Sequence, residues 1–130
     1  MSDNKLCVLK HTSDITDRQA VINESSLMSW LECDQIVQCL ELYDYHGSIY
    51  IVLELMDGGS LTSIVQKHNA NYSEDFCKYC LYMTALGLFK MHSKNVLHRD
   101  IKSDNILCSR NGDVKIADLG FSVFLSQQEK

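Results

Sequence analysis

Proline is absent from this 130-residue sequence, and tryptophan occurs only once. Without proline, the ends of helices and strands must be read from glycine pairs and from capping side chains. The sequence also lacks an apolar run long enough to cross a membrane, and its first residues lack the pattern of a secretory signal peptide. These absences predict a cytoplasmic protein with no membrane span.

Positive charge is scarce as well. The chain has 12 lysines and arginines against 17 aspartates and glutamates, which gives a net charge of -5. A nucleic-acid-binding surface requires clustered lysine and arginine, so we expect no nucleic-acid partner. The composition, 45% hydrophobic and 22% charged, is that of a globular domain.

Of the six cysteines, only Cys77 and Cys80 are closely spaced. A zinc site would require a second such pair or suitably spaced histidines, and a redox pair would require a strand, a turn and then a helix. The pair lies instead in a helical pattern, so we predict buried, reduced thiols. A zinc or thiol protein built on this pair is a minor alternative.

Apolar periodicity and turn residues predict an α+β fold. The expected elements are a buried strand at 6–9, a helix at 16–32, strands at 36–43 and 48–55, helices at 61–68 and 73–92, and strands at 106–108 and 114–116. Thr16 with Gln19, Ser60 and Ser73 are the predicted helix starts, and His46-Gly47 is a predicted hairpin turn. Asp57-Gly58-Gly59 is predicted to be a flexible connector between two domains.

Two predicted helices carry informative apolar faces. The stripe of the helix at 16–32 comprises Ala20, Leu27, Met28 and Leu31. Glu24 falls on that stripe and would need a partner if it faces inward; the alternative is a half-exposed glutamate at the edge. The helix at 73–92 is so apolar that we expect much of its surface to be buried, through Phe76, Cys77, Cys80, Leu81, Met83, Gly87, Leu88 and Met91.

A polar cluster follows the last predicted helix. Asp100, Lys102 and Asn105 precede the strand at 106–108, and Asp118 follows its predicted hairpin partner. An antiparallel hairpin brings its two ends together, so Asn105 and Asp118 can share an oxygen-ligated cation such as Mg²⁺. A carboxylate, an ammonium and a metal site are the groups that phosphoryl transfer requires.

The stretch from His98 to Asn105 has the pattern H-R-D-x-K-x-x-N, and Asp118-Leu119-Gly120 is a leucine variant of D-F-G. These motifs resemble the catalytic loop and the metal-binding motif of the protein kinase family. Residues 54–61 and 98–107 are most similar to the sterile-twenty-like kinases, in particular to the PAK-like branch. The resemblance implies a truncated two-lobe fold, with a partial small lobe at 1–56 and a partial large lobe at 57–130.

The resemblance also implies roles for the polar cluster. Asp100 would accept the proton of the substrate hydroxyl, and Lys102 would steady the transferred phosphate, as in serine/threonine kinases. Asn105 and Asp118 would bind Mg²⁺. His98 and Leu119 would stack with Met28 and Cys39 as the hydrophobic spine between the lobes.

A nucleotide site is implied by the same resemblance. Lys10 ends a segment similar to the V-A-I-K motif, and an ion pair with Glu24 would aim its ammonium at the α- and β-phosphates of ATP. Leu53 would be the gatekeeper, and Glu54 and Met56 would offer backbone groups to adenine. Leu107 is the remaining residue assigned to nucleotide binding.

The sequence therefore predicts a serine/threonine kinase that uses ATP and Mg²⁺ on protein substrates, with small-GTPase or scaffold regulators acting outside this segment. The Gly-rich loop and the A-P-E motif of the family do not occur in the 130 residues. For that reason the isolated chain is expected to be marginally stable and to have a weakened nucleotide site. The alternative is a catalytically inactive kinase-like fragment that acts as a protein-binding module.

Overall fold

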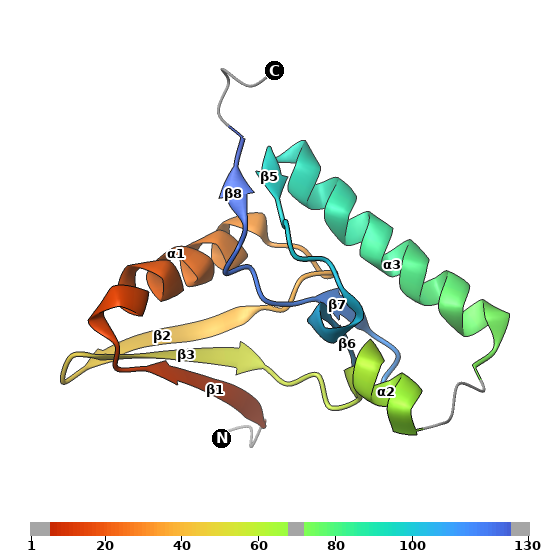
Figure 1. Cartoon of the computed structure of the whole chain (residues 1–130), viewed down its shortest axis with the longest axis horizontal. Helices are drawn as coiled ribbons and strands as arrows, with labels where there is room; N and C mark the ends of the chain where they lie inside the picture. Colours follow the sequence, from red (N-terminus) through yellow and green to blue (C-terminus); the bar gives the residue numbers. More distant parts are fainter. Residues whose placement is uncertain (1–5, 68–71, 126–130) are drawn as a thin grey trace, which may run out of the picture.

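The computed structural model describes residues 6–67 and 72–125. It confirms the predicted α+β class, with three helices among short antiparallel sheets (Figure 1). The elements are β1 (Cys7–Thr12), α1 (Ile15–Leu31), β2 (Cys39–Tyr45), β3 (Ser48–Glu54), β4 (Gly59–Ser60), α2 (Leu61–Lys67), α3 (Glu74–Ser93), β5 (Val96–Leu97), the 3-10 turn η1 (Ser103–Asn105), β6 (Ile106–Cys108), β7 (Val114–Ile116) and β8 (Val123–Phe124).

The first half of the chain is an antiparallel sheet with strand order β1-β3-β2, and α1 packs against it (Figure 1). The predicted hairpin is confirmed, with Tyr45 opposite Ser48. His46 and Gly47 have φ values of 48° and 80°, the left-handed conformations that a two-residue hairpin turn requires. The pairing of Lys10 with Ile51 places the lysine in the strand beside β3.

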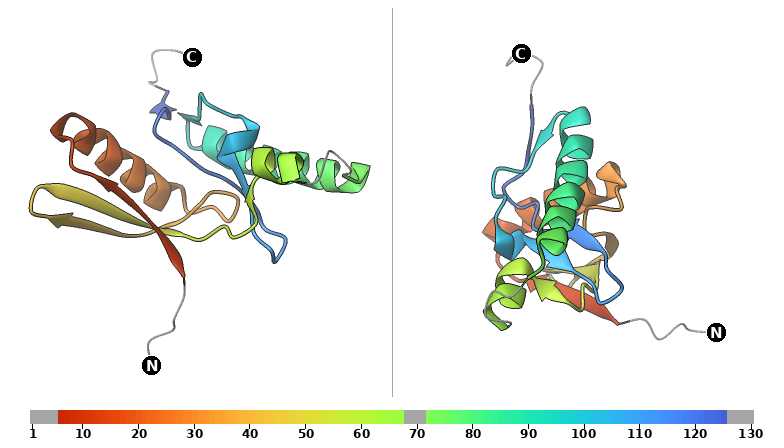
Figure 2. Two further views of the ribbon diagram at one scale, coloured as in Figure 1. Left: turned by 60° about the horizontal axis from the view of Figure 1, so that its bottom comes forward. Right: turned by 90° about the vertical axis from the view of Figure 1, so that its right-hand side faces the viewer.

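The second half consists of α2, α3 and the small sheet β4-β6-β7, set to one side of the first sheet (Figure 2). Ser73 caps α3 as predicted, because its hydroxyl accepts a hydrogen bond from the Phe76 amide at 3.2 Å. Gly87 lets α3 lie close to β7: a Cβ there would stand 2.8 Å from Cδ1 of Ile116. The β5–β8 pair, which the sequence did not predict, adds a two-stranded sheet.

One continuous core joins the two halves. It receives Leu27, Met28 and Leu31 from α1, and Cys80 and Met91 from α3. The other members are Cys33, Ile36, Val96, Ile106, Cys108, Val114, Ile116 and Leu119. The division into lobes at 56/57 stays a prediction.

Several predicted boundaries need correction. The strand expected from 36 begins at Cys39, since Ile36 bridges Ile116 in parallel and is fully buried there. Val37 donates its amide hydrogen to the Ile116 carbonyl, so this stretch ties the halves together instead of extending β2. β1 runs on to Thr12 and is exposed, because it lies at the edge of its sheet.

The predicted flexible connector is in fact tied down. Gly58 donates its amide hydrogen to the Cys108 carbonyl at 2.9 Å, and Gly59 pairs with Cys108 in the β4–β6 ladder. A Cβ at Gly58 would stand 2.7 Å from that carbonyl oxygen, so the glycine is needed for close approach. Ser60 caps α2 as predicted and accepts from the Ser63 amide.

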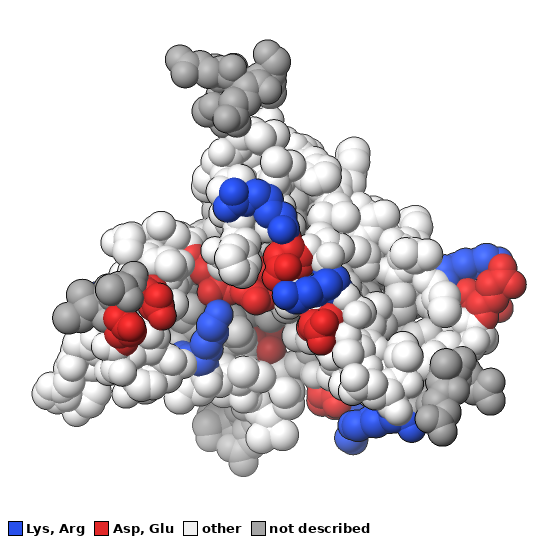
Figure 3. All heavy atoms as spheres, viewed as in Figure 1, with Lys and Arg blue, Asp and Glu red and all other residues white. Residues whose placement is uncertain are grey.

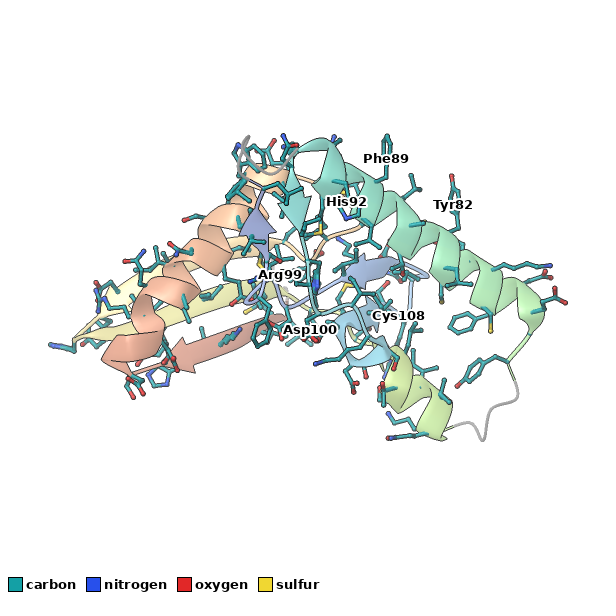
Figure 4. All side chains as sticks on the ribbon, turned by 45° about the horizontal axis from the view of Figure 1, so that its top comes forward. Tyr82, Phe89, His92, Arg99, Asp100 and Cys108 are labelled. Carbon is teal, nitrogen blue, oxygen red and sulfur yellow. The ribbon has the colours of Figure 1, made fainter. Side chains whose placement is uncertain are left out.

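The expected burial was wrong at several positions. In α1, Ala20 is exposed and Val21 is buried instead. In α3, only Cys80, Gly87 and Met91 are fully buried, because the helix contacts β7 along a single stripe. Leu81 and Phe89 are each 71% exposed, and Figure 4 shows Tyr82 and Phe89 pointing away from the molecule.

The six cysteines are free, but their burial differs from the prediction. Cys33, Cys80 and Cys108 are buried, whereas Cys7 and Cys77 are exposed. Burial raises the pKa of Cys80 to about 11, so its thiol stays protonated. α1 begins at Ile15, so Thr16 lies inside the helix and the predicted Thr16 cap is wrong. His68, the predicted end of α2, lies outside what the structure describes. None of the described helices is long and apolar enough to cross a membrane.

Candidate active site

The buried imidazole of His98 organises the loop between β5 and η1. Its Nε2 donates to the Ala117 carbonyl at 3.0 Å, which places the ring proton on Nε2. Its Nδ1 is then free to accept a hydrogen bond from the Asp100 amide, at 3.2 Å. His98 therefore fixes the backbone of Asp100 against the strand end that leads to Asp118.

The carboxylate of Asp100 is held by two neighbours. Oδ2 accepts hydrogen bonds from Lys102 Nζ at 2.9 Å and from Asn105 Nδ2 at 3.0 Å. The bond from Lys102, helped by the one from Asn105, lowers the pKa of Asp100 below its usual value. Oδ1 accepts no hydrogen bond from any of the described residues, so it is available to a substrate hydroxyl.

Lys102 lies among several carboxylates. Its hydrogen bond with Asp100 raises its pKa, and the negative charges of Asp100, Asp104 and Asp118 add to that shift. Lys102 is therefore held in its charged form by the surrounding carboxylates. Figure 3 shows acidic and basic side chains gathered in the middle of one face of the molecule.

Asn105 and Asp118 are brought together by the hairpin of β6 and β7. The Ala117 amide donates to the Asn105 carbonyl at 2.8 Å, and Asp118 is the next residue along the chain. This confirms the predicted pairing at the level of the backbone. Asp118 has φ 60° and Arg99 has φ 65°, a left-handed conformation that non-glycine residues adopt rarely and often at functional sites.

The predicted contact between Lys10 and Glu24 is present. Lys10 Nζ lies 2.9 Å from Glu24 Oε2, with the glutamate side chain 6% exposed and the lysine 46% exposed. The alternative of a half-exposed glutamate is therefore wrong. A carboxylate this deeply buried needs such a cation, so the pair also fixes α1 relative to β1.

A cavity of about 280 Å³ lies between the two halves. Its lining includes all the residues predicted to bind the nucleotide: Lys10, Glu24, Leu53, Glu54, Met56 and Leu107. Asp118 lines it as well, whereas Asp100, Lys102 and Asn105 do not. A cavity lined by apolar side chains together with an ammonium and carboxylates suits a flat ring that carries a charged group.

Residues 3–130 match the model of the protein kinase domain. The chain belongs to the protein kinase family. It is 38% identical over 110 residues to the serine/threonine-protein kinase STE20 of Kluyveromyces lactis, a match that covers 85% of this chain and 11% of that protein. The identity to the protein of the same name in Saccharomyces cerevisiae is also 38% over 110 residues, or 85% of this chain and 12% of that protein.

A second group of relatives carries a different name. The serine/threonine-protein kinase CLA4 of Candida albicans is 33% identical over 129 residues, which cover 98% of this chain and 13% of that protein. The chain thus spans about a tenth of the length of the curated relatives it matches. These similarities confirm the predicted likeness to the sterile-twenty-like, PAK-like kinases.

One ion pair at the edge of the cavity lies outside the kinase-family motifs, and the sequence did not predict it. Lys115 Nζ lies 2.7 and 2.8 Å from the two carboxylate oxygens of Glu54, and the side chains are only 13% and 25% exposed. Oε1 of Glu54 also accepts from the Gln38 amide at 2.7 Å. Lys115 alternates with the buried residues of β7, and this strand periodicity was the available signal that its side chain lies on the opposite face.

We expect Lys115→Met to lower the free energy of unfolding of this kinase-family chain by about 2 kcal/mol, because Glu54 keeps a largely buried charge without its cation. Urea unfolding at pH 7 measures the change. The matched control is Lys78→Met, which removes an exposed ion pair with Glu74 in α3 and should cost less than about 0.5 kcal/mol. Equal losses in the two variants would show that the burial of the Glu54 pair has no energetic consequence.

Proposed function

We propose that this chain carries the catalytic groups of a protein serine/threonine kinase, which transfers the γ-phosphoryl group of ATP to serine and threonine hydroxyls of proteins. The observation that carries the proposal is the Asp100 carboxylate, held by Lys102 and by Asn105, whose carbonyl accepts from the residue before Asp118. The family membership and the names of the relatives support it.

The nucleotide would occupy the 280 Å³ cavity. Lys10, held by Glu24, would meet the α- and β-phosphates, because its half-exposed ammonium lines this space. Leu53 and Leu107 would flank the adenine ring, and the backbone of Glu54 and Met56 would hydrogen-bond to its edge. Lys115 would support this segment through its ion pair with the Glu54 carboxylate.

The donor set at Asn105 and Asp118 fits Mg²⁺. Both Nδ2 bonds of Asn105 go to Asp100, so its Oδ1 points to another side and remains available to a cation. With the carboxylate of Asp118 it offers the oxygen ligands that Mg²⁺ prefers. When bound, Mg²⁺ neutralises charge on the phosphate oxygens during transfer.

The reacting groups have separate tasks. Asp100 Oδ1 would orient the substrate hydroxyl and accept its proton as the oxygen attacks the γ-phosphorus. The Lys102 ammonium, whose raised pKa keeps it charged, would stabilise the negative charge that develops on the transferred group. The resemblance extends the proposal to small-GTPase or scaffold regulators that bind outside this segment, and to a cytoplasmic location.

The test measures binding and turnover with the whole 130-residue chain. We expect Mg·ATP to raise the thermal midpoint, since a ligand at a hundred times its Kd stabilises the folded state by about 2.7 kcal/mol. We also expect phosphate from ATP to appear on serine and threonine of a mixed protein substrate. A midpoint that Mg·ATP leaves unchanged, together with no incorporation, would overturn the proposal in favour of the inactive binding module.

A further inference from the structure

Three side chains from distant parts of the chain meet at the C-terminal end of α1. Lys94, the residue after α3, donates from Nζ to the carbonyls of Trp30 at 2.6 Å and Leu31 at 3.2 Å. The same ammonium lies 4.5 Å from the centre of the Trp30 ring. The ring of Phe124 in β8 meets Trp30 edge-on, with centroids 5.3 Å apart. We call Trp30, Lys94 and Phe124 the Trp30 clamp.

The clamp supplies what α1 lacks by itself. The last four carbonyls of a helix have no partner inside the helix, and cations near that end are favourable. The last turn of α1 contains no basic residue, so Lys94 provides the cation from another element. Trp30 is 48% exposed, so its position depends on these contacts as well as on core packing.

The clamp and the candidate nucleotide site are linked through α1, which carries both Trp30 and Glu24. Glu24 and Trp30 both line a cavity of about 680 Å³, which Leu119 and Phe124 also line. Because α1 borders a hollow on this side, close packing cannot fix its position there. On this side the polar contacts of Glu24 with Lys10 and of Lys94 with the helix end therefore add to the core packing of α1 in fixing the helix.

We propose that Lys94 is a positioning residue for the nucleotide site. It holds the C-terminal end of α1, with Trp30 seated against Phe124, and thereby keeps Glu24 in place for Lys10. This inference rests on the proposed function. It also means that the segment after Asp118 helps to position α1, because Phe124 of that segment contacts Trp30. Coupling between two sites is reciprocal, so nucleotide binding must also change the surroundings of Trp30.

Trp30 is the single tryptophan of the chain, so intrinsic fluorescence reports on the clamp directly. We expect Lys94→Met to increase acrylamide quenching of Trp30 and to weaken Mg·ATP binding about fivefold, the lower end of typical coupling between sites. Lys94→Arg should preserve both properties, since a guanidinium also donates to carbonyls and stacks on indole. The control is Lys90→Met, which removes an exposed lysine in the last turn of α3.

A second arm needs no nucleotide. Glu24→Gln weakens the contact with Lys10. If the nucleotide site and the Trp30 clamp are coupled through α1, this variant must also alter the acrylamide quenching of Trp30. Unchanged quenching in this variant would overturn the inference, as would a Lys94→Met variant that loses thermal stability with unaltered Mg·ATP affinity. If the parent chain binds no Mg·ATP, the proposed function fails. The quenching of Trp30 in Glu24→Gln then decides by itself whether α1 couples the clamp to the Lys10–Glu24 pair. If circular dichroism shows that Lys94→Met is unfolded, Phe124→Leu replaces it, with the same expected results.

Discussion

Asp100→Asn is expected to slow phosphoryl transfer by about 10²–10⁴-fold, the usual contribution of a positioned general base. The asparagine keeps an oxygen for Lys102 but cannot accept the substrate proton. Mg·ATP affinity should stay close to that of the parent chain, because Asp100 does not line the nucleotide cavity. The measurements are the rate of phosphate incorporation and the thermal shift with Mg·ATP.

The control for this variant is Asp75→Asn, which changes an exposed carboxylate in the first turn of α3. It should leave the rate of transfer unaltered. The pH dependence of the transfer rate gives a further check on the parent chain. Since Lys102 lowers the pKa of Asp100, the carboxylate persists until the pH falls below the usual aspartate range. A parent-like rate in Asp100→Asn would exclude the assigned role.

Asp118→Asn is expected to weaken the Mg²⁺-dependent part of ATP binding, because the neutral amide oxygen is a poorer ligand than the carboxylate. Loss of an outer partner of a metal ligand typically costs 10–100-fold in metal affinity, and loss of a ligand itself should cost more than about 100-fold. Asparagine is the suitable replacement because Asp118 has φ 60°, a left-handed conformation that asparagine adopts at lower cost than alanine does. A change in ATP binding in this variant can therefore be attributed to the loss of the carboxylate and not to a defect in folding.

The measurement is the thermal shift with ATP alone and with Mg·ATP. In the parent chain the metal should add to the shift, and in Asp118→Asn it should add much less. Circular dichroism without ligand serves as the control for folding. If Mg²⁺ strengthens ATP binding as much in this variant as in the parent chain, Asp118 is not a metal ligand.

The sequence predicted those parts of the site whose geometry is local. The loop from His98 to Asn105 and the hairpin that leads to Asp118 lie within one short stretch, so strand pairing alone brings their ends together. The Lys10–Glu24 contact was also predicted, but from the family resemblance. Helical periodicity by itself left the exposure of Glu24 open.

The contacts that the sequence did not predict join residues far apart in the chain. The Lys115–Glu54 and Lys94–Trp30 pairs are separated by 61 and 64 positions. No periodic pattern connects such residues, because their meeting depends on how separate elements pack. The exposed face of α3 has the same cause: a pattern shows which side chains share a face, but not how much of that face a neighbour covers.

The contact of Gly87 with β7 has a consequence for the local strength of α3. A glycine inside a helix lowers its stability by roughly 0.5–1 kcal/mol relative to alanine. Alanine is the better helix former, yet its methyl group would collide with Ile116 Cδ1 at 2.8 Å and crowd Gln35 at 3.2 Å. The middle of α3 is therefore intrinsically weak as a helix, and its order depends on the strand beneath it. Amide hydrogens around Gly87 should consequently lose protection together with those of β7 rather than with the ends of their own helix.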